Sequence, residues 1–269
     1  MKKQIAWIAA LVSMSAVLSG CGNMKVTYPN ADKYTAGGTE LTESVSHICV
    51  DWISGEVLIA YHDQDTISFS ESGNRTQTES TTMQHWLDGS TLRIQFMKSG
   101  RKIENGLEKQ LTLYLPEELN DCTFTINSVS ADVQMDSIAA RSLEFESVSG
   151  NLTANLKNHL NELDADTTSG NIDVRLDALD SFEVDSVSGN LTISSTGEVK
   201  YGSADTVSGD VTLRLPEDVS FHAEVDTTSG AVQNEFDGKN GKSGIYTAGT
   251  GSNEYEIDTV SGDITFEYE

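Results

Sequence analysis

SVSGNL at residues 147–152 decides the fold, because near copies of it recur along the chain at an almost constant interval. Copies that keep the Ser-Gly pair stand at 52–57, 167–172, 186–191, 206–211, 227–232 and 259–264, and the copy at 128–133 has Ala131 in place of glycine. From Ala131 to Gly230 the steps are 19, 20, 19, 20 and 21 residues, and the last step is 32. A period near 20 indicates one small structural unit stacked many times.

Residues around each glycine alternate between apolar and polar. With the glycine as position 0, positions −7, −5, +2, +4 and +6 are mostly apolar, as in Leu143, Phe145, Leu152, Ala154 and Leu156. Period-two alternation indicates strands with one buried face. Position −2 is also mostly apolar, and we interpret this change of parity as a bend or bulge. Glycine accepts backbone angles closed to other residues, so we predict structural turns at Gly55, Gly150, Gly170, Gly189, Gly209, Gly230 and Gly262.

Two short strands and two bends in about 20 residues form one coil of a parallel β-solenoid, an all-β fold whose coils share a continuous core. Parallel crossovers are nearly always right-handed, so we expect a right-handed β-helix. Stacking would place equivalent residues about 4.8 Å apart. Hydroxyl groups at positions −3 and −1 would then form ladders that bind the backbone of the bends. An antiparallel sandwich would explain the alternation but not the fixed period.

Three regions depart from the repeat. Within the less regular stretch 62–120, Asp88-Gly89 predicts a hairpin turn. Lys98 to Lys109 holds a basic cluster that we expect to be a solvated loop tip. Gly238 to Gly251 is a Gly-rich insertion, expected to be a surface loop, and the long last step should alter only local coil geometry.

Positions −6 and −4 lie between apolar positions and should face solvent, and they are mostly acidic from residue 144 onward. Stacking would make two carboxylate ladders, with repulsion of roughly 0.9 kcal/mol between neighbours even at the dielectric constant of water. Two interpretations stay open: a charged flank that prevents lateral pairing of solenoids, or a face that binds cations. The ladder residues are Glu144, Glu146, Asp164, Asp166, Glu183, Asp185, Asp205, Glu224, Asp226, Glu256 and Asp258.

Candidate ligands of the ladder are Ca²⁺, which takes several oxygen ligands, or a cationic peptide or polymer of the cell envelope. The Gly-x-Gly-x-Asp pattern of calcium-binding solenoids is absent from the sequence. We therefore expect low-affinity, salt-sensitive binding and no dedicated cofactor.

Other chemistry is sparse. The five histidines are scattered, and no HExxH, CxxC, GxSxG or phosphate-loop pattern occurs, so we expect no enzyme activity. Cys49 and Cys122 occupy non-matching repeat positions and are either bridged or free thiols. The formal net charge of −25 argues against nucleic-acid partners, which need basic patches.

The N-terminus has the form of a secretory signal. Lys2 and Lys3 precede an apolar stretch at 5–18, which is too short for a spanning helix. Leu18-Ser19-Gly20-Cys21 resembles a bacterial lipobox, which implies cleavage before Cys21 and lipid attachment to its sulfur; an ordinary signal peptide with an incidental cysteine is the alternative. We therefore predict a signal peptide at 1–20, a polar tether at 21–43 and a solenoid domain at 44–269.

WISGEV at 52–57, LYLP at 113–116 and the serial repeats resemble the DUF4097 family of bacterial β-strand-repeat proteins, often described as proposed adhesins. The resemblance implies a β-solenoid at the cell envelope with no established enzyme activity. The predicted function is a lipid-anchored, extracytoplasmic and non-catalytic interaction or adhesin-like module, with a membrane contact and a cationic envelope component or protein as partners. The alternatives are a purely structural or envelope-stress accessory protein, or a carbohydrate-active enzyme.

Overall fold

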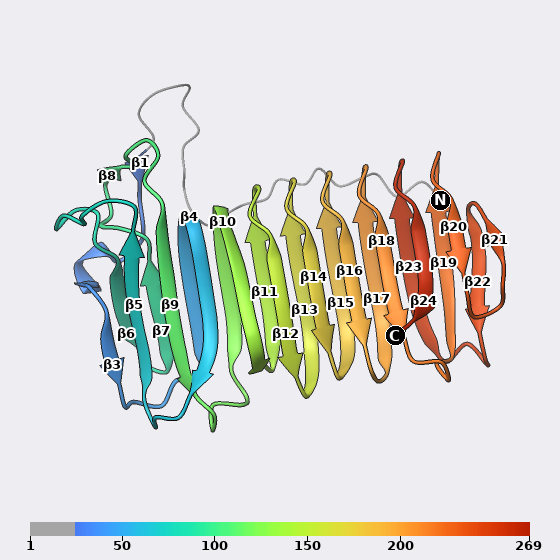
Figure 1. Ribbon diagram of the computed structural model, residues 1–269, viewed down its shortest axis with the longest axis horizontal. Helices are drawn as coiled ribbons and strands as arrows, with labels where there is room; N and C mark the ends of the chain where they lie inside the picture. The colour runs from blue at the N-terminus through green and yellow to red at the C-terminus, as the bar shows by residue number, and fades with distance from the viewer. Residues whose placement is uncertain (1–24) are drawn as a thin grey trace.

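The computed structural model describes residues 25–269 and shows an all-β, solenoid-like fold (Figure 1). Among these residues the one helical element is the short 3-10 helix η1 (Ala31–Lys33), and none is long and apolar enough to cross a membrane. The predicted signal peptide at 1–20 and the lipidation site at Cys21 lie outside the described residues.

The centre of the molecule is a stack of coils whose strands pair in parallel with the equivalent strands of the next coil (Figure 1). Phe145 aligns with Ala165, and Ala165 aligns with Val184. This parallel pairing excludes the antiparallel sandwich. The central strands are β10 (Thr123–Ala139), β11 (Ser142–Ser147), β12 (Leu152–Lys157), β13 (His159–Thr167), β14 (Ile172–Leu176), β15 (Ala178–Ser186), β16 (Leu191–Ser195), β17 (Val199–Thr206) and β18 (Val211–Leu215).

The core lies inside the coils and contains the predicted apolar positions. Leu143, Phe145, Leu152, Ala154 and Leu156 are all 5% exposed or less, and they belong to one cluster that includes apolar residues of both end regions. Each coil alone would leave this face in water, so stacking supplies the burial that holds the strands together.

At the C-terminal end the coils do not stack in chain order. β23 (Asn253–Thr259) pairs in parallel with both β17 and β19 (Phe221–Thr227), and β24 (Ile264–Tyr268) pairs with both β18 and β20 (Val232–Asn234). The last coil of the sequence is therefore inserted one place before the end of the stack (Figure 1). The expectation that the long last step alters only local geometry was wrong, because the chain passes to the outer coil and then returns.

The insertion at 238–251 forms part of the cover over this end. β22 (Gly244–Ala248) pairs antiparallel with β19, and β21 (Asn240–Gly241) pairs antiparallel with β20. The segment thus occupies the hydrogen-bonding edge of the outermost coil, which would otherwise be open to pairing with another chain.

The N-terminal end has the same arrangement. β4 (His47–His62) pairs in parallel with β10 on one side, and with β7 (Thr91–Gln95) and β9 (Lys109–Pro116) on the other. The first coil of the sequence, formed by β4, is therefore the second coil of the stack at this end, and β7 and β9 form the outer one. β5 (Ile67–Gly73) and β6 (Gln84–Asp88) pair antiparallel with β9 and β7, which confirms the hairpin at Asp88-Gly89.

Residues 25–41 complete the N-terminal cover. β1 (Lys25–Val26), β2 (Thr35–Ala36) and β3 (Thr39–Leu41) pair with β8 (Arg101–Lys102), β6 and β5, and Val26 and Tyr28 are buried. This paired part of the predicted tether at 21–43 packs on the domain instead of leading freely away from it.

The predicted basic loop contains a buried cation. The side chain of Lys109 is inaccessible, and its Nζ lies 2.6 Å from Glu71 Oε2 and donates to the carbonyl oxygens of Thr81 and Phe96. Trp52 Nε1 donates to the Lys109 carbonyl oxygen. The expectation of a wholly solvated tip was therefore wrong for Lys109, whose charge is neutralised inside the N-terminal cover. Cys49 and Cys122 are free thiols.

From residue 128 onward a hydroxyl group closes each repeat turn, and the change of parity that we predicted does not occur there; in the first copy Trp52 stands at position −3 and both Trp52 and Ile53 are buried. The strand keeps its alternation through position −3, so Ser147 and its equivalents are buried, while Val148 at position −2 is 39% exposed. The Ser147 Oγ accepts a hydrogen bond from the Gly150 N–H at 2.7 Å, and Thr167 Oγ1 does the same for Gly170 at 2.8 Å. Hydropathy predicted the wrong buried residue here, because the buried hydroxyl group forms a hydrogen bond with the backbone of its own turn.

The repeat glycines are needed for close packing between coils. Of the seven, Gly55 has a positive φ, at 97°, whereas the other six do not, so the conformational reason that we predicted fails for those six. A Cβ on Gly170 would overlap the carbonyl oxygen of Gly150, and a Cβ on Gly189 would overlap that of Gly170. Only glycine lets neighbouring turns approach this closely.

Candidate functional site

The predicted acidic residues form two columns on one sheet face, where a column is the set of side chains at one repeat position. At position −4 the register places Glu146, Asp166, Asp185 and Asp205 on successive strands. Because the last coil is inserted, Asp258 follows Asp205 and Asp226 comes last. The position −6 column reads Glu144, Asp164, Glu183, Ser203, Glu256 and Glu224. We call these two sets the carboxylate columns.

Burial and mutual repulsion raise the pKa values of these side chains. The pKa of Glu146 rises to about 7, chiefly because the side chain is half-buried and then because Glu144 and Asp166 lie beside it. The pKa values of Asp164 and Asp185 each rise to about 6 for the same two reasons, burial first and neighbouring carboxylates second. Glu146 is therefore partly protonated near pH 7, and Asp164 and Asp185 become partly protonated near pH 6, well above the pH at which exposed carboxylates bind protons.

No basic side chain relieves this repulsion in the central coils. Among residues 25–269, none of Glu144, Glu146, Asp164, Asp166, Glu183 and Asp185 forms an ion pair with Lys, Arg or His. One oxygen of Glu146 is buried without a hydrogen-bond partner. The described part of the chain also has no group of three or more His, Cys, Asp or Glu side chains placed to hold a metal ion. The columns thus offer diffuse negative charge, not a formed coordination site.

The carboxylate columns end where polar neutral groups take over. Asn127 aligns with Glu146 on the neighbouring strand, and its Nδ2 donates a hydrogen bond to Asp51 Oδ1, one strand further on, at 2.8 Å. At the other end the Ser243 hydroxyl donates to Asp226 Oδ1 at 2.6 Å. Burial also raises the pKa of Asp51. The acidic surface therefore covers the six coils from β11 to β19.

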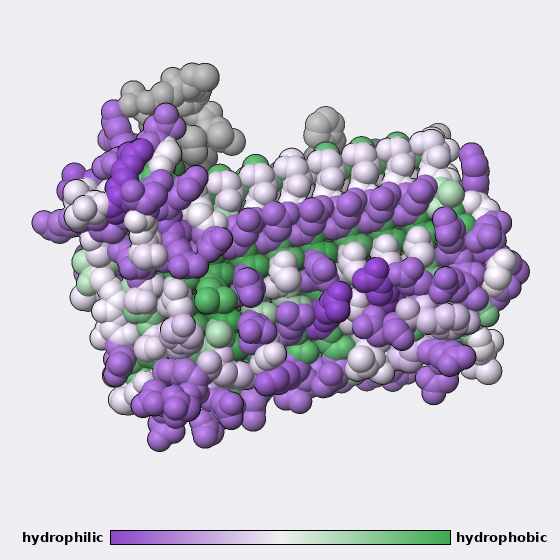
Figure 2. Space-filling model, in the orientation of Figure 1, coloured by the Kyte–Doolittle hydropathy of each residue, from purple (hydrophilic) through white to green (hydrophobic). Residues whose placement is uncertain are grey.

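A third column, at position +1, was not predicted from the sequence. The Asn151 Oδ1 accepts a hydrogen bond from the Asn171 N–H at 2.9 Å, and the Asn171 Oδ1 accepts one from the Asn190 N–H at 3.0 Å. The same bond recurs through Asp210 and Asp263 and ends at the N–H of Ala231. We call this set the amide column; Figure 2 shows it as a continuous hydrophilic row along the molecule. Its signal was the Asn or Asp that follows the Ser-Gly pair in most copies of the repeat.

The predicted hydroxyl ladder at position −1 is confirmed. The hydroxyl groups of Ser149, Ser169 and Ser188 donate to the carbonyl oxygens of Val129, Val148 and Thr168 in the neighbouring coil. The corner between the two sheets is therefore held by hydroxyl and amide groups that bind backbone, with the exposed valines of position −2 beside them.

The model of the Toastrack DUF4097 family matches residues 45–175 and 123–267, which is most of the chain. This chain belongs to the Toastrack DUF4097 family. No curated protein sequence matches it.

Solved structures similar to this Toastrack chain share little sequence with it. A proposed adhesin from Bacteroides fragilis is 12% identical, with 87% of this chain and 97% of that chain covered and a TM-score of 0.43. A proposed lipid-binding protein from Parabacteroides distasonis is 14% identical, with 88% and 95% covered and a TM-score of 0.40. A proposed cell adhesion protein from Clostridium sporogenes is 15% identical, with 87% and 100% covered and a TM-score of 0.34.

Proposed function

We propose that this Toastrack protein is a lipid-anchored, extracytoplasmic interaction module, adhesin-like and without catalytic activity. In this proposal the carboxylate columns bind multivalent cations or cationic ligands of the cell envelope. The observation that supports it is the register of Glu146, Asp166, Asp185, Asp205, Asp258 and Asp226 on adjacent strands. For the framework we propose right-handed winding with coils of about 20 residues, on the preference of parallel crossovers and the repeat period.

The charge pattern favours ligands that carry several positive charges. Neighbouring carboxylates are about one strand spacing apart, so a polycation of similar spacing relieves several repulsions at once. A monovalent ion relieves only one and is easily displaced by salt. Since a cation binds the deprotonated columns, its binding should release protons from groups whose pKa values are raised, such as Glu146.

The membrane anchor in this proposal is supported by the sequence of residues 18–21. The described chain begins at β1, which lies in the N-terminal cover beside β8. Cys21 precedes Lys25 by four residues, a reach of at most about 14 Å. A lipid on Cys21 would therefore hold the N-terminal end of the solenoid close to the membrane surface.

Thermal melting of the chain without residues 1–21 tests the cation-binding face. We expect millimolar Ca²⁺ or a short polylysine to raise the midpoint more than Na⁺ at equal ionic strength, because a ligand that prefers the folded state stabilises it. The variant D166N/D185N/D205N should lose that excess. The control E117Q/E118Q/E217Q removes the same charge from exposed turn residues and should keep it.

Two results would contradict the binding proposal. One is an equal rise with Na⁺ and with the multivalent cations, which would indicate charge screening alone. The other is a multivalent effect that the D166N/D185N/D205N variant retains. Either result would favour a structural or spacer role in which the charge only keeps solenoids apart.

A further inference from the structure

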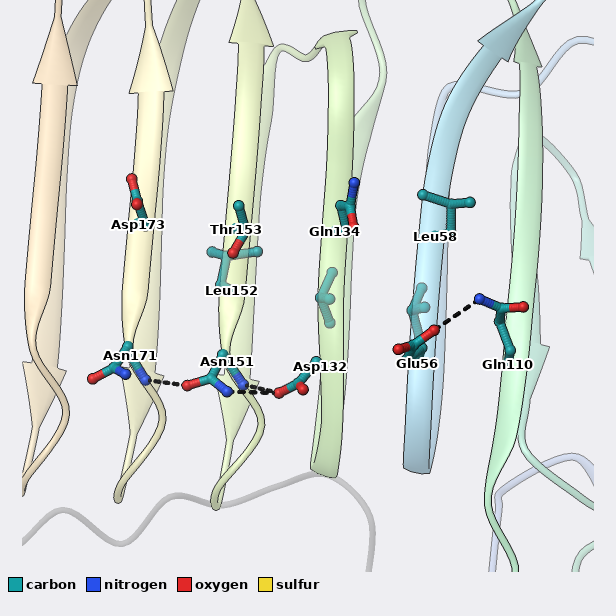
Figure 3. A pocket seen from close by; sticks show the side chains of 12 residues that line it. Glu56, Leu58, Gln110, Asp132, Gln134, Asn151, Leu152, Thr153, Asn171 and Asp173 are labelled. Carbon is teal, nitrogen blue, oxygen red and sulfur yellow. Dashed lines mark hydrogen bonds between the residues drawn. The ribbon is translucent and has the colours of Figure 1, made fainter. Parts of the chain in front are cut away.

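A groove with a volume of about 490 Å³ lies on the sheet face that carries the amide column, over β9, β4, β10, β12 and β14 (Figure 3). Its floor includes Val57, Val133 and Leu152, all buried. Its rim is polar and follows two repeat positions, +1 and +3. This groove is separate from the carboxylate columns, which occupy the strand segments before the turns.

The groove lies where the series of hydrogen bonds along the amide column stops, between Asp132 and Glu56. Asp132 Oδ1 accepts hydrogen bonds from both the backbone N–H and the side-chain amide of Asn151, at 2.9 and 2.7 Å. Glu56, which aligns with Asp132 on the next strand, instead accepts a hydrogen bond from Gln110 Nε2 at 2.8 Å. The two carboxylates are thus held toward opposite sides, as Figure 3 shows, and within the described residues no hydrogen bond joins them.

Alanine replaces glycine at this same junction. Every later coil has glycine at position 0, where a Cβ would overlap a carbonyl oxygen of the preceding coil. Ala131 carries that Cβ and aligns with Gly55. At this junction β10 and β4 pair in parallel from Ser130 and Ser54 onward through Ala131 and Gly55, whereas the later coils leave the ladder between positions −3 and +2. The departure from the repeat and the groove therefore coincide.

The groove presents hydrogen-bond acceptors without protein donors. Within residues 25–269, Glu56 Oε1 and Asp132 Oδ2 have no hydrogen-bond partner. The Oδ1 of Asp173, at position +3, is buried and has no hydrogen bond, and the nearest Arg175 nitrogen is 3.9 Å away. Gln134 and Thr153 add side chains that can both donate and accept. Leu58 stands at position +3, where other coils have polar residues, and it adds a partly exposed apolar surface.

We propose that this groove binds an extended, neutral polysaccharide chain. Sugar hydroxyls donate to carboxylates and exchange hydrogen bonds with amides and hydroxyls, and the C–H faces of the rings suit the apolar surface of Leu58. The rim groups repeat at the strand spacing of about 4.8 Å, which is close to the length of one pyranose ring. A metal ion fits less well, because no group of three or more His, Cys, Asp or Glu side chains in the described chain is placed for one.

Calorimetric titration tests this with three probes: β-1,4-linked hexamers of glucose, of N-acetylglucosamine and of glucosamine. We expect at least one neutral hexamer to bind. T153W fills the groove and should weaken that binding at least about tenfold, whereas T212W lies in the same column beyond the groove and should leave it unchanged. D132N should also weaken it, and D210N, its counterpart in the amide column, should not.

Three outcomes would overturn the proposal: no binding of either neutral hexamer, binding of the cationic hexamer alone, or neutral binding that T153W leaves intact. The carboxylate columns are tested separately, because D166N/D185N/D205N should bind the neutral hexamer like the unmodified chain. The groove variant T153W should in turn keep the excess stabilisation by Ca²⁺.

Discussion

The carboxylate columns and the amide column arise from the same repetition, yet repetition has opposite effects on them. In the amide column each side-chain oxygen faces a backbone N–H of the next coil, so every added coil adds a hydrogen bond. In the carboxylate columns most side chains have another carboxylate as their neighbour, so most added coils add repulsion. A repeated side chain therefore stabilises a stacked fold only when it can bond to the backbone or to the same side chain of the next coil. Repeated side chains that repel one another persist where solvent and bound protons reduce the repulsion.

The largest expected effect lies at the turn that both columns share. G170A should lower the free energy of unfolding by about 3 kcal/mol, because the added Cβ would overlap the Gly150 carbonyl oxygen and force two coils apart. Urea unfolding followed by circular dichroism would measure it. G238A is the control: Gly238 has a φ of 67° and open space around it, so it should cost about 1 kcal/mol.

If both glycine variants lowered the free energy of unfolding by a similar amount, the close-packing explanation would be contradicted. The backbone conformation of glycine would then be the better explanation. A smaller loss for G170A than for G238A would show that the coils can separate at the turn with little cost.

A change of pH should alter the contribution of the carboxylate columns to stability. The native pKa values of Glu146, Asp164 and Asp185 lie above their ordinary values, so the native state binds more protons than the unfolded state between about pH 4.5 and 7. Stability from these groups is therefore present at the acidic end of that window and is lost as pH rises through it. We expect the free energy of unfolding to be about 2 kcal/mol higher at pH 5 than at pH 8. The difference is no larger because solvent partly screens these half-exposed groups.

The triple variant E146Q/D164N/D185N provides the control for this pH dependence. Its stability should change less between pH 5 and pH 8, since the neutral side chains no longer bind protons. Melting midpoints at matched ionic strength would show the difference. A domain that is more stable at pH 8 than at pH 5 would contradict the raised pKa values.

Much of the architecture could be predicted because periodicity is a property of many residues at once. The buried positions represented by Phe145 and Leu152 and the acidic register of Asp166 and Asp185 all follow from it. The turn could not be assigned from hydropathy. Ser147 is polar and buried while Val148 is apolar and exposed, since the turn hydrogen bond outweighs the side-chain transfer energy.

The order of the coils was harder to predict because every copy of the repeat fits beside every other. One residue did carry the information. Ala231 stands at position +1, where its backbone N–H donates to Asp263 Oδ1, but it has no side-chain oxygen to accept a hydrogen bond from the N–H of a further coil. A coil with alanine there is suited to the end of the stack, and the coil of Asp263 must precede it. The groove was not predicted because it depends on which way Glu56 and Asp132 turn, and their partners are fixed only by the register of β4, β9 and β10.

The smallest effects compare the two kinds of column directly, with one substitution in each. N171A removes the acceptor for the Asn190 N–H and should lower the free energy of unfolding by about 0.5–1 kcal/mol, since the freed group is exposed to water. D185N removes one charge between Asp166 and Asp205 and should raise it by about 0.5 kcal/mol at low salt. In 1 M NaCl, where the Debye length is about 3 Å, the gain from D185N should shrink while the loss from N171A persists. If both variants changed with salt in the same way, the two columns would not differ in the kind of interaction they repeat, and the contrast between neutral hydrogen bonds and repelling charges would fail.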